Sequence, residues 1–303
     1  MIDAVLLGTG GMQPLPKRWL SSFLIRVNGH LTLFDCGEAT QVAWRQSGWG
    51  FRRLGTIFVS HTHADHIAGL PGLLHALANA GRTEPIGLFG PVGTAAVVAA
   101  LRVIAPVLPY EVRITELRGD ERFLVPGGLV GSCEPGDHAL PVLAYRLDLA
   151  RGRAFLPERA RALGVPIDLW GRLQAGEPVS WHSGTATPDA VLGPPRPGLS
   201  IAYVTDTRPT PKMPRFLESV ELLICEGTYA THEELPKAVR NRHMTFGEAA
   251  TMARDAGANR LWITHFSPAL EDPGAFTANA SNIFPEATIG HDGLKISLPF
   301  PDG

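Results

Sequence analysis

The amino-acid sequence predicts an α/β fold, in which short buried strands alternate with helices. Three observations support this prediction. Short apolar runs recur along the whole chain of 303 residues. Several of these runs end on a single polar residue. Segments in which the apolar residues have helical spacing lie between them. Since α/β folds place functional groups at the C-terminal tips of strands, we expect the functional site of this protein at such tips.

The composition is that of a globular protein with one or two domains. Hydrophobic residues make up 45% and charged residues 18%, and the net charge of −2 does not indicate a nucleic-acid partner. No apolar run has the length of a membrane span, and the first residues lack the features of a secretory signal. The chain has three cysteines, Cys36, Cys133 and Cys225, which argues against a disulfide framework. We therefore expect a cytoplasmic protein that does not enter a membrane.

The first half of the chain is expected to be mainly β-structure with helices between some strands. Asn28-Gly29 is a favoured pair for the turn of a β-hairpin, and apolar runs lie on both sides of it. Residues 111–149 alternate short apolar runs with turns, which is typical of further strands. The expected strands are 5–7, 22–27, 31–34, 56–59 and 86–90, and the expected helices are 73–78 and 94–105.

The second half repeats one pattern, in which an apolar strand ends on a polar residue. The strand at 201–205 ends on Asp206, that at 221–225 on Glu226, and that at 261–264 on His265. A helix is expected from Thr245 to Ala256, because Gly257 follows the last turn.

The segment from 150 to 195 differs in character from the rest, and we interpret it as an inserted arm. It is rich in Gly and Pro. Its arginines are the local basic feature in a chain of net negative charge, and they are suited to phosphate contacts. A solvated loop with helical fragments is the alternative. The arginines are Arg151, Arg153, Arg159, Arg161 and Arg172.

The densest chemical signal is the sequence His61-Thr62-His63-Ala64-Asp65-His66. It follows an apolar strand and precedes a helix, so we expect it in a loop. His61 and His63 should project to the same side, because they are two residues apart in extended chain. The neighbours Asp65 and His66 should point in different directions. Imidazole and carboxylate together favour zinc, with manganese and iron as near competitors. A solvated histidine-rich loop is the alternative.

A site with two metals needs further ligands, and His138, Asp206 and His265 are the best candidates outside this loop. Each lies next to an apolar strand. A lone histidine at the end of a strand is often structural, so its position alone does not show that it binds a metal. His243 lies just before the predicted helix at 245–256. The remaining histidines have no metal-like spacing and are expected at the surface or in the core: His30, His75, His182, His232 and His291.

These residues resemble the metallo-β-lactamase superfamily and, more specifically, the ribonuclease Z family. The resemblance covers nearly the whole chain in the order of the family. It rests on segments 7–11, 34–41, 60–74, 137–138, 192–198, 203–209 and 264–267. Asp35-Cys36-Gly37-Glu38 and Thr205-Asp206-Thr207-Arg208-Pro209 are the most specific of these.

The resemblance implies a four-layer αββα sandwich as a single domain over 1–303, with an exosite-like arm inserted at 150–195. It also implies two Zn²⁺ ions per chain (Mn²⁺ or Fe²⁺ in their place) and a homodimer. The order of the ligands assigns His61, His63 and His138 to one metal, assigns Asp65, His66 and His265 to the other, and makes Asp206 the bridge.

The activity that the resemblance implies is phosphodiester hydrolysis, with a tRNA precursor as the substrate that loses its 3′ trailer. Asp65 is then the proton acceptor and His243 the catalytic acid, and we expect Glu226 to orient His243. The basic arm at 151–172 is expected to bind the RNA.

Three departures from the family pattern concern RNA or phosphate handling rather than metal ligands. The family has Ser where this chain has Met244, its N-terminal basic loop is degenerate at 14–19, and a Gly-Pro pair is missing after Gly164-Val165-Pro166. A phosphodiesterase for cyclic nucleotides or cyclic phosphates is therefore an alternative. A non-catalytic RNA-binding protein with a structural metal is another.

Overall fold

The computed structural model describes residues 1–301, which separate into two compact units. The first unit comprises Met1–Leu149 and Ser200–Pro299, and the second comprises Ala150–Leu199 with Phe300 and Pro301. None of the helices described has the length and apolar character that a membrane crossing requires.

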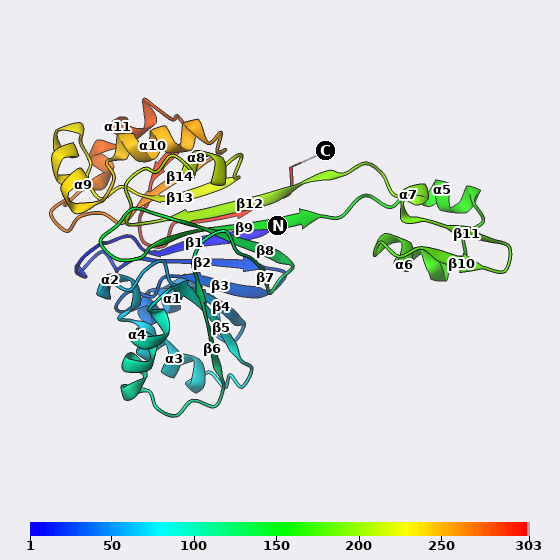
Figure 1. Cartoon of the computed structure of the whole chain (residues 1–303), viewed down its shortest axis with the longest axis horizontal. Helices are drawn as coiled ribbons and strands as arrows, with labels where there is room; N and C mark the ends of the chain where they lie inside the picture. Colours follow the sequence, from blue (N-terminus) through cyan, green and yellow to red (C-terminus); the bar gives the residue numbers. More distant parts are fainter. Residues whose placement is uncertain (302–303) are drawn as a thin grey trace. The chain divides into compact units, whose positions relative to one another are not determined.

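The first unit contains two seven-stranded sheets (Figure 1). In the first sheet, the strands from β16 to β3 pair in antiparallel fashion, and those from β3 to β6 are parallel. Its order is β16 (Lys295–Leu298), β1 (Ile2–Gly8), β2 (Ser22–Val27), β3 (His30–Phe34), β4 (Leu54–Phe58), β5 (Ile86–Pro91) and β6 (Val112–Leu117).

In the second sheet, the strands from β12 to β15 are parallel, and β7, β8 and β9 are antiparallel. Its order is β15 (Ala287–Ile289), β14 (Leu261–Thr264), β13 (Leu222–Glu226), β12 (Arg196–Val204), β9 (Leu143–Arg151), β8 (Leu129–Pro135) and β7 (Arg122–Val125).

Helices cover the outer face of each sheet, so that the layers run helix, sheet, sheet, helix (Figure 1). The first sheet carries α1 (Thr40–Ser47), α3 (Leu70–Asn79) and α4 (Thr94–Leu101). The second carries α8 (Met213–Phe216), α10 (Phe246–Asp255) and α11 (Ala278–Ser281), with α9 (Leu235–Asn241) nearby. The predicted αββα sandwich is therefore confirmed.

Aromatic side chains fill the space between the two sheets. Phe58 of β4 packs against Tyr145 of β9 with ring centroids 4.7 Å apart, and Phe34 of β3 lies 5.4 Å from Tyr203 of β12. Both tyrosine hydroxyls are satisfied: Tyr145 donates to the Val59 carbonyl and Tyr203 to the Asp35 carboxylate. Each such buried side chain stabilises the fold by ~1.5–3 kcal/mol, and the core thereby fixes how the strand tips of the two sheets face each other.

Most predicted elements are present, although several begin earlier than expected: the strand at 5–7 is Ile2–Gly8, the helix at 73–78 is Leu70–Asn79, and the strand at 201–205 is Arg196–Val204. The helix expected at 94–105 ends at Leu101 and continues as a 3-10 turn at Arg102–Ile104. Pro106 explains this, because the residue before a proline is pushed out of helical geometry, and Ala105 has φ −134°. The polar cluster expected in a loop includes one helical turn, α2 (Ala64–Ile67).

The second unit has a small apolar core of its own. Its elements are α5 (Pro157–Ala162), α6 (Trp170–Gln174), α7 (Pro188–Val191) and the hairpin of β10 (Val179–Trp181) with β11 (Gly184–Ala186). Ala160, Leu173 and Val191 are fully buried within it. Several of its arginines have acidic partners nearby: Arg153 with Asp189, Arg161 with Glu158, and Arg172 with Glu177.

Candidate metal centre

Three residues that lie one or two positions after the end of a strand share an unusual backbone conformation. Asp35 after β3, Asp206 after β12 and His265 after β14 have φ values of 57°, 46° and 60°. Residues other than glycine rarely adopt this left-handed region, and their clustering is typical of functional sites. The chain turns sharply at each strand tip, and all three side chains are buried.

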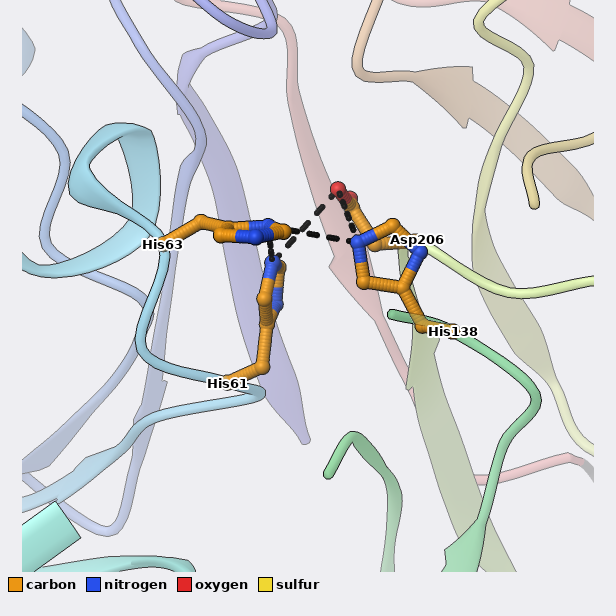
Figure 2. Close-up of side chains that lie close together, drawn as sticks. All are labelled: His61, His63, His138 and Asp206. Carbon is orange, nitrogen blue, oxygen red and sulfur yellow. Dashed lines mark hydrogen bonds and ion pairs between the residues drawn. The ribbon is translucent and has the colours of Figure 1, made fainter. Parts of the chain in front are cut away.

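The first group of candidate ligands consists of His61, His63, His138 and Asp206, whose ligand atoms all lie within 4.8 Å of one another. Figure 2 shows the four side chains converging from three segments of the chain. Nδ1 of His63 lies 2.9 Å from Nε2 of His61 and 3.2 Å from Nε2 of His138. Oδ2 of Asp206 lies 3.6 Å from Nε2 of His61 and 3.8 Å from Nε2 of His138.

The second group consists of Asp65, His66 and His265. Nε2 of His66 lies 3.2 Å from Nε2 of His265, and Oδ2 of Asp65 lies 3.4 Å and 3.3 Å from these two atoms. Asp206 reaches this group as well, because its Oδ1 lies 3.3 Å from His66 and 3.1 Å from His265. The two oxygens of Asp206 thus face different groups, as expected of a bridging carboxylate.

The expectation that Asp65 and His66 point in different directions was wrong. Both lie on the turn α2, where successive residues are separated by about a third of a turn rather than by half a turn. The two side chains therefore converge. Oδ2 of Asp65 is held further by the backbone N–H of Met12, 2.6 Å away.

The hydrogen bonds on the outer side of the histidines test whether a cation fits this cluster. Nδ1 of His66 donates to the carboxylate of Asp35 (2.7 Å), and Nδ1 of His138 donates to the carbonyl of Arg242 (3.1 Å). Nδ1 of His61 faces the hydroxyl of Ser60 (3.1 Å). Because that hydroxyl itself donates to Asp35, it accepts from His61. In its neutral form, each of these rings thus carries its proton on the outer nitrogen, which leaves a lone pair on Nε2.

His265 follows the same rule through Thr228. The Thr228 hydroxyl donates to Glu226 and therefore accepts from Nδ1 of His265, 3.0 Å away. Four buried imidazole lone pairs and two carboxylates consequently face one another at 3–4 Å. Lone pairs that face each other in a buried site repel unless a cation lies between them, so this donor set fits metal ions.

The pKa values differ between the two groups. Burial lowers the pKa of His61 well below its usual value, and burial also lowers that of His138. Burial acts on His66 in the same direction, but the carboxylates of Asp206 and Asp35 outweigh it and raise its pKa.

His243 and Glu226 form a buried ion pair beside both groups. Nδ1 of His243 lies 3.2 Å from Oε2 of Glu226 and 3.9 Å from Oδ2 of Asp206. Burial opposes its charge, but Glu226 dominates and raises the pKa of His243 to about 9. Backbone N–H groups of Thr207 and Met244 also donate to Glu226, which fixes the carboxylate. Met244, one of the departures from the family pattern, is fully buried in the core.

The centre opens into a cavity of about 460 Å³, lined among others by His63, Asp65, His138, Arg242 and His243. The five histidines without metal-like spacing, His30, His75, His182, His232 and His291, are all exposed.

Sequence reasoning missed the residues that hold the ligands: Asp35, Ser60, Thr228 and the carbonyl of Arg242. Of these residues, only Asp35 could have been recognised from the sequence, because it follows an apolar strand just as Asp206 does.

Comparisons with known proteins show the fold class of this protein. Residues 178–266 match the family described as beta-lactamase superfamily domain, and residues 2–91 match the one described as anti-Pycsar protein Apyc1. The crystal structure of the short form of human tRNase Z has a TM-score of 0.71 with this chain at 23% identity, covering 98% of this chain and all of that one. The protein therefore has the metallo-β-lactamase fold.

Relatives with higher sequence identity show the family within this fold class. The ribonuclease Z of Clostridium kluyveri is 44% identical over 303 residues and covers 100% of both chains. That of Lachnoclostridium phytofermentans is 43% identical over 300 residues and covers 99% of both. The chain belongs to the ribonuclease Z family, as its motifs predicted.

Proposed function

We propose that this protein is a metal-dependent endoribonuclease that removes the 3′ trailer of tRNA precursors. The observation that carries the proposal is the buried pair of His243 and Glu226, which lies beside a cluster of metal-type donors. Metal-assisted hydrolysis of a phosphodiester needs both features, a cationic centre and an acid for the leaving oxygen. Membership of the ribonuclease Z family supports the choice of substrate.

The seven candidate ligands would hold two cations. His61, His63 and His138 form one site, Asp65, His66 and His265 form the other, and Asp206 serves both. Zinc is the cation that suits five imidazoles and two carboxylates best, with manganese and iron as competitors. When bound, two such cations neutralise charge on the phosphate and make water a better nucleophile at neutral pH.

The side chains of the protein handle the protons. His243, kept protonated by Glu226, delivers its proton to the leaving 3′-oxygen as the bond from phosphorus to that oxygen breaks. Asp65 accepts or positions the proton of the attacking water, and the backbone N–H of Met12 holds the Asp65 carboxylate in place. The products are an RNA with a free 3′-hydroxyl and a trailer with a 5′-phosphate.

The segment 150–195 is proposed to bind the RNA through its arginines, because phosphate contacts supply most of the affinity of a nucleic-acid-binding surface. A homodimer, on the grounds of family resemblance, and a cytoplasmic location, on the grounds of the three widely spaced cysteines, complete the proposal.

The test is an assay of purified, zinc-loaded protein on a precursor tRNA beside a cyclic nucleotide. We expect one cut that leaves the mature 3′ end, and no turnover of the cyclic nucleotide. The reverse result would replace the ribonuclease with a small-molecule phosphodiesterase. Binding of the precursor with no turnover of any phosphodiester, including an activated one, would indicate a non-catalytic RNA-binding protein.

A further inference from the structure

A basic cleft lies in the first unit at the end of β2 and β3 that is remote from the metal centre. Its volume is about 250 Å³, and it is lined by Arg26, Gly29, Leu31, Trp49, Gly50, Arg52 and Arg53. Three of these seven residues carry a guanidinium group and none carries a carboxylate. Such a lining favours an anion.

Two of the three arginines form no ion pair within 4 Å among the residues described, although Arg52 also interacts electrostatically with the carboxylate of Glu84. Arg26 is occupied, because it donates twice to the carboxylate of Asp3 and stacks over the ring of Trp49 at 4.6 Å. Arg52 and Arg53, by contrast, form no ion pair among residues 1–301. Their side chains are the unpaired cations of this cleft.

The backbone holds these two arginines in place before any ligand binds. The carbonyl of Arg52 accepts a hydrogen bond from the side chain of the buried Arg82 (2.7 Å), and the carbonyl of Arg53 accepts from the N–H of Leu31 (3.0 Å). Gly29 keeps space for the head group of Arg53, since a Cβ there would lie 2.5 Å from its Nη1. The backbone is thus fixed, and only the two exposed side chains need to be ordered on binding.

The chain segment that contributes Trp49, Arg52 and Arg53 to this cleft is positively charged. No acidic residue occurs between Glu38 and Asp65, and this stretch contains Arg45, Arg52 and Arg53. Arg45 lies over the ring of Phe51 at 5.5 Å. In a chain with a net charge of −2, this combination of arginines and aromatic rings resembles the surfaces that bind nucleic-acid strands.

We propose that this cleft is a phosphate-binding site for Arg52 and Arg53, outside the metal centre. Its volume lies below the ~300–1,000 Å³ of a typical cofactor pocket, so it accepts a single phosphate group rather than a whole cofactor. The source of the phosphate is either an RNA strand or a free phosphate ion. The RNA source rests on the proposed function, and the experiment separates the two sources.

The geometry allows an RNA strand to reach both sites. β2 begins at Ser22, directly after Ser21, whose hydroxyl donates to the carbonyl of Gly10 in the loop that carries Met12, and its residue Arg26 lines the cleft. At ~3.3 Å per residue, its six residues span roughly 20 Å. A stacked strand that rises ~3.4 Å per nucleotide along its axis covers this distance in about six nucleotides.

The experiment removes both free guanidinium groups with the double variant Arg52→Gln/Arg53→Gln. The matched control, Arg118→Gln/Arg122→Gln, removes two exposed arginines that also form no ion pair among the described residues. Three quantities are measured on the zinc-loaded proteins: the affinity for precursor tRNA as a function of salt, the binding of inorganic phosphate by calorimetry, and the hydrolysis of a small activated phosphodiester.

We expect the cleft variant to bind inorganic phosphate at one site fewer than the control and to bind precursor tRNA about tenfold more weakly at low salt. The slope of log K against log salt should become shallower by ~0.7–0.9, as one phosphate contact is lost. Hydrolysis of the activated phosphodiester should stay unchanged, because the metal centre is intact.

Loss of phosphate binding with an unchanged tRNA slope would assign the cleft to free phosphate and reject the RNA source. Equal phosphate binding and equal slopes in the cleft variant and the control would overturn the proposal. If the wild type fails to cut precursor tRNA, the proposed function fails, but the phosphate titration still decides whether the cleft binds phosphate.

Discussion

The two halves of the metal centre are built from similar ligands but supported in different ways. His66, in one half, donates its outer N–H to the carboxylate of Asp35 at 2.7 Å. His61 and His138, in the other half, donate to a hydroxyl and to a backbone carbonyl. A carboxylate partner makes an imidazole a stronger ligand. The half with Asp65, His66 and His265 should therefore bind its cation more tightly than the half with His61, His63 and His138.

The residues near the centre differ in which half of it they contact. Asp206 belongs to both halves and His243 belongs to neither. Asp35 contacts a histidine of only one half, His66, and reaches His61 of the other half only through the hydroxyl of Ser60. Substitutions of the three should have separable effects on metal content and on rate, which makes the comparison testable.

The largest effect is expected for Asp206→Ala. Because the two oxygens of this carboxylate face both groups, the variant should lose metal from both halves, and hydrolysis should fall to background. Metal content by mass spectrometry and turnover of an activated phosphodiester are the measurements. Full metal content with wild-type turnover would remove Asp206 from the centre.

His243→Ala should leave both metals bound and lower the rate on precursor tRNA by ~10²–10⁴-fold, the usual contribution of a general acid. The loss should be much smaller for a substrate with a good leaving group, which needs no proton. Equal losses on natural and activated substrates would contradict the role of acid.

The pH profile provides a second test of His243. This side chain can donate a proton only while protonated, so the rate should fall as the pH rises through its pKa. That pKa is about 9 with Glu226 as partner, and bound cations lower it by repulsion. We therefore expect an alkaline limb at or below pH 9 in the wild type and no such limb in His243→Ala.

These residues show which parts of the fold and of the candidate site could be predicted from the sequence. The candidate ligands from His61 to His66 lie within six residues of one another, so the sequence shows their metal-type chemistry directly. The position of Asp206 and His265 near this group could be predicted because each follows an apolar strand, and parallel strands bring their tips to one edge. The αββα sandwich and the family followed from motif order.

The supporting contacts could not be predicted. Asp35 and His66 are 31 residues apart, and Thr228 and His265 are 37 apart. Such pairs form only when different strand tips meet in space, which no local pattern encodes. The turn α2 was missed because four residues are too few to show helical periodicity.

Removing the second unit tests a region that supplies none of the candidate ligands. Deletion of 152–195, closed by a short Gly-Ser linker, removes its whole core, whereas a cut ending near 180 would leave Val191 and Leu192 without their partners. Metal content and turnover of the activated phosphodiester should stay near wild type. Affinity for precursor tRNA should fall by ~10–100-fold, and its salt dependence should flatten.

Full processing of precursor tRNA by this deletion variant would show that the arginines of the arm do not bind the RNA. The full-length variant Arg159→Gln serves as the milder control, because it removes one charge and keeps the arm. Arg159 is exposed and forms no ion pair among the residues described.

The smallest effect, and the most direct test of the comparison, is expected for Asp35→Asn. The amide keeps the shape of the carboxylate but removes its charge, so the support of His66 weakens while His61 and His138 keep their neighbours. Removing such a partner typically lowers metal affinity by ~10–100-fold. Titration with a chelator should show one of the two cations leaving earlier than in the wild type, while the other is unchanged.

A loss of stability alone would not distinguish this role, because Asp35 also accepts hydrogen bonds from Ser60 and Tyr203. Tyr203→Phe is the matched control: it removes one donor to the same carboxylate and leaves the charge beside His66. Both variants should unfold at lower temperature, by an amount that corresponds to ~1–3 kcal/mol. Only Asp35→Asn should release a cation early. If both variants release metal alike, or if both cations leave Asp35→Asn together, the two halves are not supported differently and the comparison fails.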